Sequence, residues 1–316
     1  MTMHDEFEKI DWLKARFELD GVPSGAVVGI GDDAAVFDTG GPSVLTVDAQ
    51  VEGVHFRRDL LSPADLGWRA LVSAASDIVA MAATPVATLC SLTLPRDYSP
   101  DDFEALIEGL ADAATATGAG VVGGNLSQAD ALTLTTTVVG VPVDSPLGRK
   151  GARPGETVYV TGTLGGAALG FRILDSGAEH VPRAADFITR WRRPHHRGEL
   201  SPTLARVASA CIDVSDGCLQ DLGHLCRASG VGAVLDVTTL PFDHGFEDAC
   251  HSLDVDPVEL ALGGGEDYEL LFTAPRSTEA DSIATAIGSV IEGDGVRALG
   301  PEGDLLSLDG GFRHFS

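Results

Sequence analysis

The chain has 316 residues and a formal net charge of -26 at pH 7, with 47 acidic residues against 21 basic ones. So negative a protein repels nucleic acids and anionic membranes, and we expect neither as a partner. The chain has only three lysines: Lys9, Lys14 and Lys150. High acidity with few lysines is typical of halophilic proteins, in which high salt screens the repulsion between surface charges. The length and a hydrophobic content of 44% favour an α/β protein of two domains.

Cysteine content and the N-terminal sequence indicate the cellular compartment. The five cysteines form no CxxC pair, so neither a disulfide framework nor a zinc site is indicated. The first residues lack a basic start followed by an apolar run, and no window of about 18 uncharged apolar residues occurs. We therefore expect a cytoplasmic protein.

The first elements are a helix and a short strand. Apolar residues at helical spacing predict a helix over residues 5–20, and a strand is predicted over 26–30. The strand leads into Gly31-Asp32-Asp33, and two adjacent acids fit poorly in a packed strand. A ligand site and an ordinary type I turn both remain open there.

A second strand is predicted over residues 43–47, and Asp48 stands at its expected end. Gly53 and His55 follow closely. An acid at a strand end, followed by a glycine and a histidine, is a common way for α/β proteins to present polar groups to a ligand. A plain turn residue is the alternative for Asp48.

A long helix is predicted from Ser62, the N-cap, with Pro63 in its first turn, to residue 79. Asp77 lies late in this helix among small and apolar neighbours. The helix dipole disfavours an anion at that end, and an unpaired buried carboxylate is costly. A metal ion or exposure to solvent would resolve the conflict.

The rest of the first half is predicted as alternating strands and a helix: 87–94, helix 100–117, 120–122 and 132–141. Gly123-Gly124-Asn125 follow the third of these segments. Glycines allow a backbone to approach a ligand closely, and a hairpin-like turn is the alternative. Around residues 142–154 the composition changes to Pro, Gly, Arg and Asp, so we predict domains over 1–145 and 146–316.

The second domain begins with a strand over 157–161, the glycine turn 162–166 and a helix from Ala167. Neither GxGxxG nor GxxxxGK[ST] is present, so a plain strand–turn–helix is expected. Further on, a strand over 211–213 leads into a helix that ends at Ala228. Its N-cap is predicted to be Ser215 or Asp216, whereas Asp213 lies inside the strand.

The last informative segments are acidic and aromatic. Residues 263–267 form a predicted turn that carries Glu266 and Asp267 into a strand over 268–273. The aromatic residues of 310–315 could pack as a tail or cover a ligand. The acids at element ends or in unfavourable settings form one set, and carboxylates are the ligands of hard cations such as Mg²⁺: Asp33, Asp48, Asp77, Asp213 and Asp216. The nucleophile motif GxSxG is absent.

Six motifs occur in an order that resembles the thiamine-monophosphate kinases. They are GDDAAV from Gly31, TVDAQVEGVHF from Thr46, SDIVAM from Ser76, the pair Gly123-Gly124, IDVSDG from Ile212 and GGEDYEL from Gly264. The kinases share a superfamily with aminoimidazole ribonucleotide synthetase, selenophosphate synthetase and the hydrogenase maturation dehydratase. The combination of VEGVHF, GGEDYEL and a terminal GFRHF is the most specific part of the resemblance, which spans nearly the whole chain.

The resemblance implies a fold and a reaction. The expected N-terminal domain binds ATP and Mg²⁺ and has a four-stranded mixed sheet that pairs with a second copy into a dimer barrel, and a C-terminal α/β domain follows. The implied reaction is direct, in-line transfer of the γ-phosphoryl group of ATP to thiamine monophosphate, with several Mg²⁺ ions and no side chain as acid, base or nucleophile. The acceptor is a phosphate monoester, mostly dianionic at pH 7, so it needs positioning and charge neutralisation rather than a general base.

The resemblance also implies site residues. Metal ligands would be Asp33, Thr46, Val47 through its carbonyl, Asp48, Asp77, Asn125, Asp213 and Asp216. ATP would contact Gly124, Asn125, Arg149 and Ser215, and the thiamine substrate would contact His55, Glu266 and Phe312. The family usually has aspartate where this chain has Asn125, so we expect activity with a raised Mg²⁺ requirement.

Two other readings remain. Another ATP-dependent member of the superfamily, such as an aminoimidazole ribonucleotide synthetase, would share the acidic motifs but is not expected to carry VEGVHF with GGEDYEL. A non-catalytic acidic protein that binds nucleotide or metal would keep the acids without needing His55 or Phe312.

Overall fold

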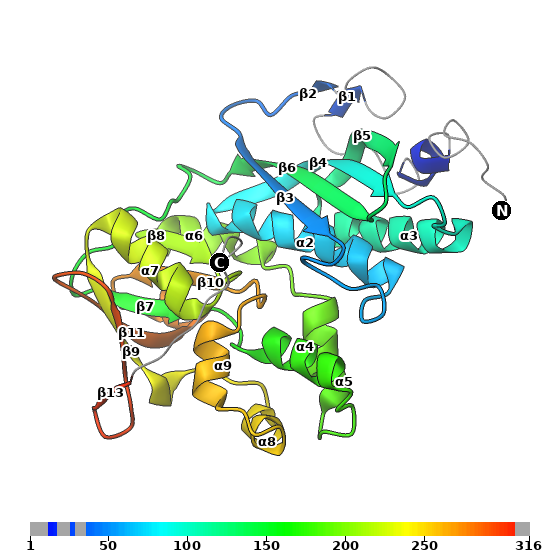
Figure 1. The fold of residues 1–316 in the computed structure, drawn as a ribbon. Coiled ribbons are helices and arrows are strands. Elements are labelled where there is room, and N and C mark those ends of the chain that lie inside the picture. The colour runs from blue at the N-terminus through cyan, green and yellow to red at the C-terminus, as the bar shows by residue number, and fades with distance from the viewer. Residues whose placement is uncertain (1–11, 18–25, 29–35, 307–316) are drawn as a thin grey trace. The chain divides into compact units, whose positions relative to one another are not determined.

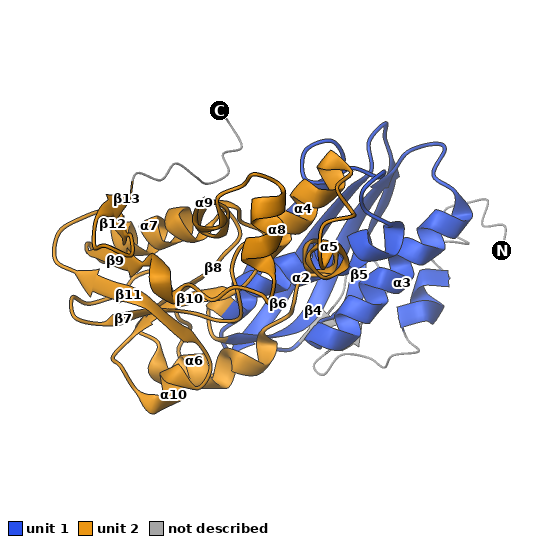
Figure 2. Cartoon of the chain, turned by 90° about the horizontal axis from the view of Figure 1, so that it is seen from below, with its two compact units in different colours: residues 1–79, 83–142 blue, residues 80–82, 143–316 orange. Residues whose placement is uncertain are grey.

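The computed structural model describes residues 12–17, 26–28 and 36–306. The chain divides into two compact units, one of residues 1–79 and 83–142 and one of residues 80–82 and 143–316 (Figure 2). Each unit has a sheet and helices, which confirms the predicted α/β class. The roles assigned to the predicted domains 1–145 and 146–316 stay a prediction.

Unit 1 has a four-stranded sheet in the order β3-β6-β4-β5. Its strands are β3 (Val44–Val51), β4 (Ala83–Leu94), β5 (Gly120–Gln128) and β6 (Thr133–Pro142). β6 pairs antiparallel with β3 and with β4, whereas β4 and β5 are parallel. The helix α3 (Pro100–Thr117) connects the parallel pair, as a crossover must. The sheet is therefore mixed, as predicted.

One face of this sheet is covered by α2 (Pro63–Ala80) and α3 (Figure 1). The alternation along β3 shows the two faces, because successive side chains of a strand point to opposite sides. Val44 and Gln50 are buried, whereas Leu45 and Val47 are 67% and 65% exposed. The face opposite the helices is therefore open and partly apolar within unit 1.

Both helices begin with a serine cap, and the one at Ser62 was predicted. The hydroxyl of Ser62 accepts a hydrogen bond from the Asp65 amide (3.2 Å) and donates to the Asp65 carboxylate (2.8 Å). Ser99 and Asp102 repeat this arrangement at α3. Each serine hydroxyl thereby satisfies one of the free N–H groups of the first turn.

Several strands are longer than predicted. β3 continues to Val51 and β5 to Gln128, because β6 and β4 pair with them along their whole length. Asp48 therefore lies within a strand and not at its end, so that prediction was wrong. Likewise, Gly123-Gly124-Asn125 lie inside β5 and not in a turn.

The N-terminal elements are described in part. The predicted helix over 5–20 is helical at residues 12–17, and the predicted strand over 26–30 is present as β1 (Ala26–Val28). β1 pairs antiparallel with β2 (Val36–Phe37). Asp33 lies outside the described residues.

Unit 2 has a seven-stranded sheet in the order β13-β12-β9-β11-β7-β10-β8. The strands are β7 (Thr157–Val160), β8 (Ala210–Asp213), β9 (Gly232–Asp236), β10 (Leu270–Ala274), β11 (Thr285–Ile291), β12 (Val296–Leu299) and β13 (Leu305–Leu306). β10, between β7 and β8, is buried at every residue. All pairs are antiparallel except β12 with β9.

The helices of unit 2 are α4 (Gly166–Ser176), α5 (Ala184–Arg192), α6 (Ser201–Val207), α7 (Cys218–Ser229), α8 (Phe246–Ser252), α9 (Pro257–Gly263) and α10 (Thr278–Asp281), with the 3₁₀ turns η1 (Gly198–Leu200) and η2 (Val237–Thr239). α4 packs on α5, and α9 contacts α4, α7 and α8 (Figure 1). Among the described residues, no helix is both long and apolar enough to cross a membrane.

α2 and α3 approach each other at two glycines. A Cβ atom on Gly67 would overlap the carbonyl oxygen of Leu106, and one on Gly109 would overlap that of Ala64. Both obstacles are backbone atoms, which cannot rotate away. The close crossing of the two helices therefore depends on the missing side chains.

We expect Gly109→Ala to lower the free energy of unfolding by about 1–3 kcal/mol, because overpacking outweighs the roughly 1 kcal/mol that alanine gains in helix propensity. Denaturant unfolding measures the change. Gly41→Ala is the control, since nothing lies within 4 Å of a Cβ there. Equal stability of both variants would contradict the close crossing.

Candidate functional site

In unit 1, two hydrogen bonds join β3 to α2. The Thr46 hydroxyl donates to Asp77 Oδ2 (2.6 Å), and the Ser73 hydroxyl donates to Asp48 Oδ2 (3.1 Å). Thr46 and Asp48 are alternate residues of the strand, and Ser73 and Asp77 are one helical turn apart, so the two contacts lie side by side. The structure thus brings together three predicted site residues: Thr46, Asp48 and Asp77.

The outer edge of β3 adds a further oxygen. Glu52 N–H donates to Leu132 O (3.0 Å), and because antiparallel pairs alternate, the even-numbered residues of β3 form the hydrogen-bonded pairs with β6. The carbonyl group of Val47 therefore points away from β6. Beside it, the Ala49 amide donates to Asp48 Oδ1 (2.7 Å). A hydroxyl, a carbonyl and two carboxylates meet along this edge, and such a set of oxygens suits a hard cation.

His55 is fixed in the turn after β3. Its Nδ1 accepts a hydrogen bond from the Val51 amide (3.1 Å), and its own amide donates to Val51 O (2.9 Å). Gly53, with a φ of +78°, makes this turn feasible. Because Nδ1 is an acceptor here, the ring proton of the neutral imidazole is on Nε2.

Asn125 lies apart from this group. The register connects Ala49, Thr135, Ser91 and Asn125 in one row across the sheet. Residues of one row share a face, so Asn125 belongs to the open face, opposite that of Thr46 and Asp48. Gly124, its neighbour, is needed for close packing of the strands, because a Cβ there would overlap the carbonyl oxygen of Cys90. The roles predicted for both residues in ATP and metal binding stay predictions.

In unit 2, a buried carboxylate holds the loop between β8 and α7. Asp221 Oδ2 accepts hydrogen bonds from the amides of Ser215, Asp216 and Gly217, each at 3.1 Å. Burial, with the charge of Asp216, raises the pKa of Asp221 to about 7. The N-cap of α7 is Gly217, with no side-chain bond, so the prediction of Ser215 or Asp216 was wrong.

A second loop interlocks with the first. The Glu266 amide donates to Ser215 O (2.8 Å) and the Tyr268 amide to Val214 O (2.9 Å). Gly265 has a φ of +67°, and a Cβ there would lie 2.6 Å from Ser215 O. The predicted site residues Ser215, Asp216 and Glu266 therefore belong to one pair of joined loops, and Asp213 ends the strand that leads into the first loop.

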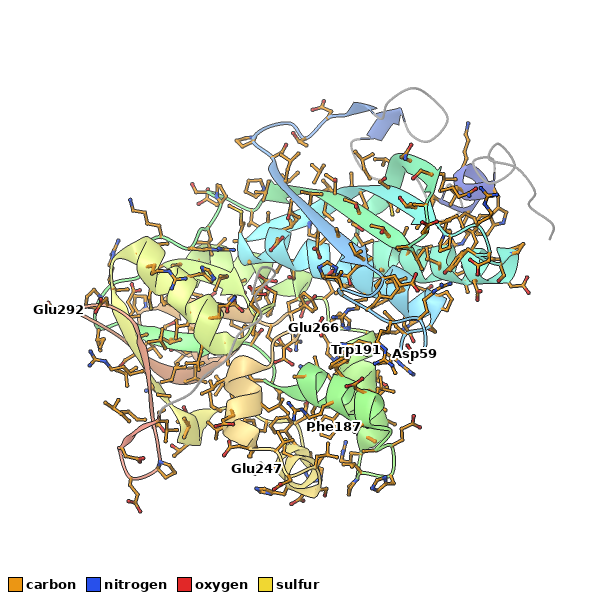
Figure 3. All side chains as sticks on the ribbon, viewed as in Figure 1. Asp59, Phe187, Trp191, Glu247, Glu266 and Glu292 are labelled. Atoms are coloured by element: carbon orange, nitrogen blue, oxygen red, sulfur yellow. The ribbon has the colours of Figure 1, made fainter. Side chains whose placement is uncertain are left out.

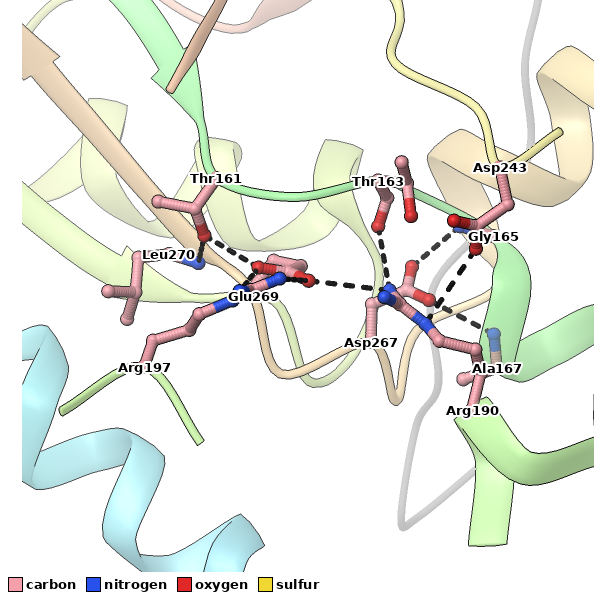
Figure 4. A network of polar contacts seen from close by, with 10 residues as sticks. All are labelled: Thr161, Thr163, Gly165, Ala167, Arg190, Arg197, Asp243, Asp267, Glu269 and Leu270. Carbon is pink, nitrogen blue, oxygen red and sulfur yellow. Dashed lines mark hydrogen bonds and ion pairs between the residues drawn. The ribbon is translucent and has the colours of Figure 1, made fainter. Parts of the chain in front are cut away.

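Asp267 explains the glycine turn at 162–166, which is a strand–turn–helix as predicted. Its carboxylate accepts hydrogen bonds from the amides of Gly165 (2.7 Å) and Ala167 (3.1 Å), at the start of α4 (Figure 4). A helix N-terminus attracts anions. Here the protein's own carboxylate takes that place, and its burial raises its pKa to about 7.

Glu269 is the centre of a buried ion-pair network (Figure 4). Its side chain is 0% exposed and accepts from Arg197 Nη2 (2.6 Å), Arg190 Nη2 (3.3 Å) and the Thr161 hydroxyl (2.7 Å). A buried charge is tolerated only when it is paired and hydrogen-bonded. Through Arg190 and Arg197, the network connects the end of α5 and the following residues to the start of β10.

The structural roles of three buried acids were not predicted from the sequence: Asp221, Asp267 and Glu269. An acid in the first turn of a helix and an acid inside an apolar strand were the available signals. Among the described residues, no group of three or more His, Cys, Asp and Glu side chains is arranged to hold a metal ion. Arg149 is described through its carbonyl, which accepts from Ser229 (3.0 Å), and Phe312 lies outside the described residues.

Known proteins match this chain closely. Residues 31–142 match the family described as AIR synthase related protein, N-terminal domain. The thiamine-monophosphate kinase of Aquifex aeolicus is 35% identical over 289 residues, which covers 90% of this chain and 92% of that protein. The Escherichia coli K12 enzyme of the same name is 38% identical over 79% of this chain and 77% of its own length. The chain belongs to the thiamine-monophosphate kinase family.

Solved structures agree with this membership. The thiamine-monophosphate kinase of Stenotrophomonas maltophilia has a TM-score of 0.82 at 33% identity and covers 94% of this chain and 96% of its own. AaThiL complexed with AMPPCP and TMP has a TM-score of 0.80 at 32% identity and covers both chains fully. The Escherichia coli hydrogenase maturation protein HypE, at 20% identity and a TM-score of 0.74, shares the fold.

The raised pKa of Asp267 predicts a pH dependence of stability in this family member. The folded state holds the proton up to about pH 7, whereas the unfolded chain releases it near 3.8. The contribution of Asp267 to the free energy of unfolding is therefore complete below pH 4, and it is lost as the pH rises through 7. Relative to Asp267→Asn, the wild-type free energy of unfolding should fall between pH 5 and 7.

Denaturant unfolding at constant salt measures this difference. The control is Asp294→Asn, an exposed acid of the same unit, whose difference from wild type should be flat over this range. A flat difference for Asp267→Asn as well would show that burial does not raise the pKa of this carboxyl group.

Proposed function

We propose that this chain transfers the γ-phosphoryl group of ATP to thiamine monophosphate, giving thiamine diphosphate and ADP. The observation that carries the proposal is the match over both full chains to AaThiL, which was solved with AMPPCP and TMP. The hydrogen-bonded set of Thr46, Asp48 and Asp77 supports it from this chain's own residues.

The transfer is direct and in line. The acceptor phosphate, with a second pKa near 6, is already a nucleophile at pH 7, so no side chain has to remove a proton. Catalysis then depends on positioning the two phosphates and on neutralising their charge. No nucleophilic side chain is required.

Mg²⁺ would supply the charge that neutralises the phosphates when bound. In unit 1 the residues that would hold it are Thr46, Asp48, Asp77 and, through its outward carbonyl, Val47. In unit 2 they are Asp213, at the end of β8, and Asp216, in the loop held by Asp221. With Asn125 in place of the usual aspartate, we expect a raised Mg²⁺ requirement.

The open face of the unit 1 sheet supports the predicted homodimer. Leu45, Val47 and Leu89 are 67%, 65% and 39% exposed on it. Apolar side chains gathered on one sheet face are typical of a surface that another copy covers. A homodimer and a cytoplasmic location are parts of this proposal.

The proposal predicts which acceptor stimulates ADP release. Thiamine monophosphate should raise the rate at least tenfold over ATP alone, and the ribonucleotide precursor of aminoimidazole ribonucleotide should not. A coupled ADP assay at several salt concentrations makes the comparison. Stimulation by the ribonucleotide alone would favour the other superfamily reaction, and stimulation by neither would favour a non-catalytic binding protein.

We expect Asp48→Ala and Asp77→Ala each to lower kcat/KM by about 10²-fold or more, because each removes an oxygen that holds charge near the transferred group. Asp130→Ala, an exposed acid of unit 1, is the matched control and should keep the wild-type rate. Thermal unfolding verifies that all three variants are folded. Wild-type rates for both Asp48 and Asp77 variants would refute the assignment.

A further inference from the structure

Ser73 is a buried polar residue in the middle of α2. It is 3% exposed, and its hydroxyl donates to Asp48 Oδ2 at 3.1 Å. Its neighbours in the helix, Val72 and Ala74, are both 0% exposed. A hydroxyl group in such surroundings costs free energy unless it is hydrogen-bonded. No role was predicted for Ser73 from the sequence, and its partner is a predicted metal ligand.

The hydroxyl of Ser73 has a second acceptor within its own helix. It lies 3.4 Å from the carbonyl oxygen of Ala70, and serines in helices commonly bond to a carbonyl three or four residues earlier. That carbonyl also accepts the α-helical hydrogen bond from the amide of Ala74. Asp48 Oδ2 is closer and belongs to a carboxylate, to which hydrogen bonds are stronger. The carboxylate on the strand is therefore the better acceptor for Ser73.

The carboxylate of Asp48 is held from two sides. Its Oδ1 accepts from the Ala49 amide (2.7 Å), and its Oδ2 accepts from Ser73. One donor belongs to the backbone of β3 and the other to the helix that covers the sheet, so the two bonds fix the orientation of the carboxylate relative to both elements. Because an ionised carboxylate offers about four lone-pair positions, two donors leave room for a cation.

Other predicted site carboxylates accept a similar bond. The Thr46 hydroxyl on β3 donates to Asp77 on α2 (2.6 Å). In unit 2, Trp191 lies in the last turn of α5, is 1% exposed, and donates from Nε1 to Glu266 Oε2 at 2.9 Å (Figure 3). In each case a neutral donor from one element orients a carboxylate on another. The bond from Ser73 to Asp48 has the same form.

We propose that Ser73 is a positioning residue that orients the Asp48 carboxylate for Mg²⁺, and so sets the Mg²⁺ concentration that the protein needs. The inference rests on the proposed function, which gives Asp48 a metal ion as its ligand. Hydrogen-bond partners of metal-binding carboxylates commonly contribute about ten- to hundred-fold to metal affinity. The physical reason is that a ligand already held in place loses little freedom when the metal binds.

The test measures metal binding directly, without turnover. Mn²⁺ is the probe, because the free ion gives a paramagnetic resonance signal that is lost on binding. Titration of the full chain at constant high salt, without nucleotide, gives the dissociation constant, and comparison with Asp48→Ala identifies the site to which Asp48 contributes. We expect Ser73→Ala to weaken binding at this site about ten- to hundred-fold.

Thr136→Val is the matched control. Thr136 lies opposite Asp48 in the register of β3 and β6, is 1% exposed, and has a hydroxyl without a hydrogen-bond partner. The variant therefore removes a buried hydroxyl from the same face of the sheet without removing a donor to Asp48, and the Mn²⁺ constant should not change. Equal Mn²⁺ binding by wild type and Ser73→Ala, or by wild type and Asp48→Ala, would overturn the proposal.

The double variant of Ser73→Ala and Asp48→Ala tests coupling. If Ser73 acts through Asp48, the double variant binds Mn²⁺ no more weakly than Asp48→Ala alone, whereas additive losses would contradict the proposal. In the ADP assay, the half-saturating Mg²⁺ concentration of Ser73→Ala should rise by the same factor as the Mn²⁺ constant, with kcat restored at saturating Mg²⁺. A residue that only packs α2 against the sheet would lower kcat in a way that Mg²⁺ does not restore.

Ser73→Cys keeps the test decisive if Ser73→Ala does not fold, which thermal unfolding shows. The thiol has nearly the same volume but is a weak donor. It should also weaken Mn²⁺ binding, and wild-type affinity in this variant would refute the role of Ser73. Wild-type turnover is measured separately. Absence of turnover with thiamine monophosphate refutes the proposed function while the Mn²⁺ titration still decides the role of Ser73, and turnover with unchanged metal binding in the variants refutes only that role.

Discussion

Buried carboxylates that accept backbone N–H groups are the constraint on which unit 2 depends. Asp221 gathers three amides of the loop after β8, and Asp267 takes two at the start of α4. Each joins segments that have little regular structure of their own. The cost of burying an acid is offset because several donors converge on it. The loops that carry Ser215, Asp216 and Glu266 therefore have a defined shape.

The same chemistry works differently in unit 1, where neighbouring elements and not loops are joined. Thr46 and Asp48 lie on one face of β3 and reach one face of α2. Asp77 was a puzzle as an acid near the C-terminal end of a helix. The hydrogen bond from the Thr46 hydroxyl partly explains its position, because a short hydrogen bond stabilises the carboxylate that the helix dipole disfavours.

The sequence was sufficient for some features because they depend on local patterns. The cap at Ser62 and the helix over 100–117 follow from neighbouring residues. Strand ends were less predictable, because pairing partners extended β3 past Asp48 and β5 past Asn125. That extension places Asn125 on the open face, which no local signal indicated.

The networks of unit 2 were beyond a reading of the sequence for a different reason. Asp267 meets Gly165 across 102 positions of the chain, and Trp191 meets Glu266 across 75. A single sequence contains no information on which distant residues meet. The arginines of residues 190–197 and the acid in the apolar stretch before β10 signalled that buried charges needed partners, without identifying them.

The place of Trp191 has an optical consequence. The chain has three tryptophans, and the other two, Trp12 and Trp68, belong to unit 1. Indole emission from unit 2 therefore comes from one side chain, and that side chain touches Glu266. A form of the protein with phenylalanine at positions 12 and 68 would carry its own fluorescent reporter at this carboxylate, with no added dye.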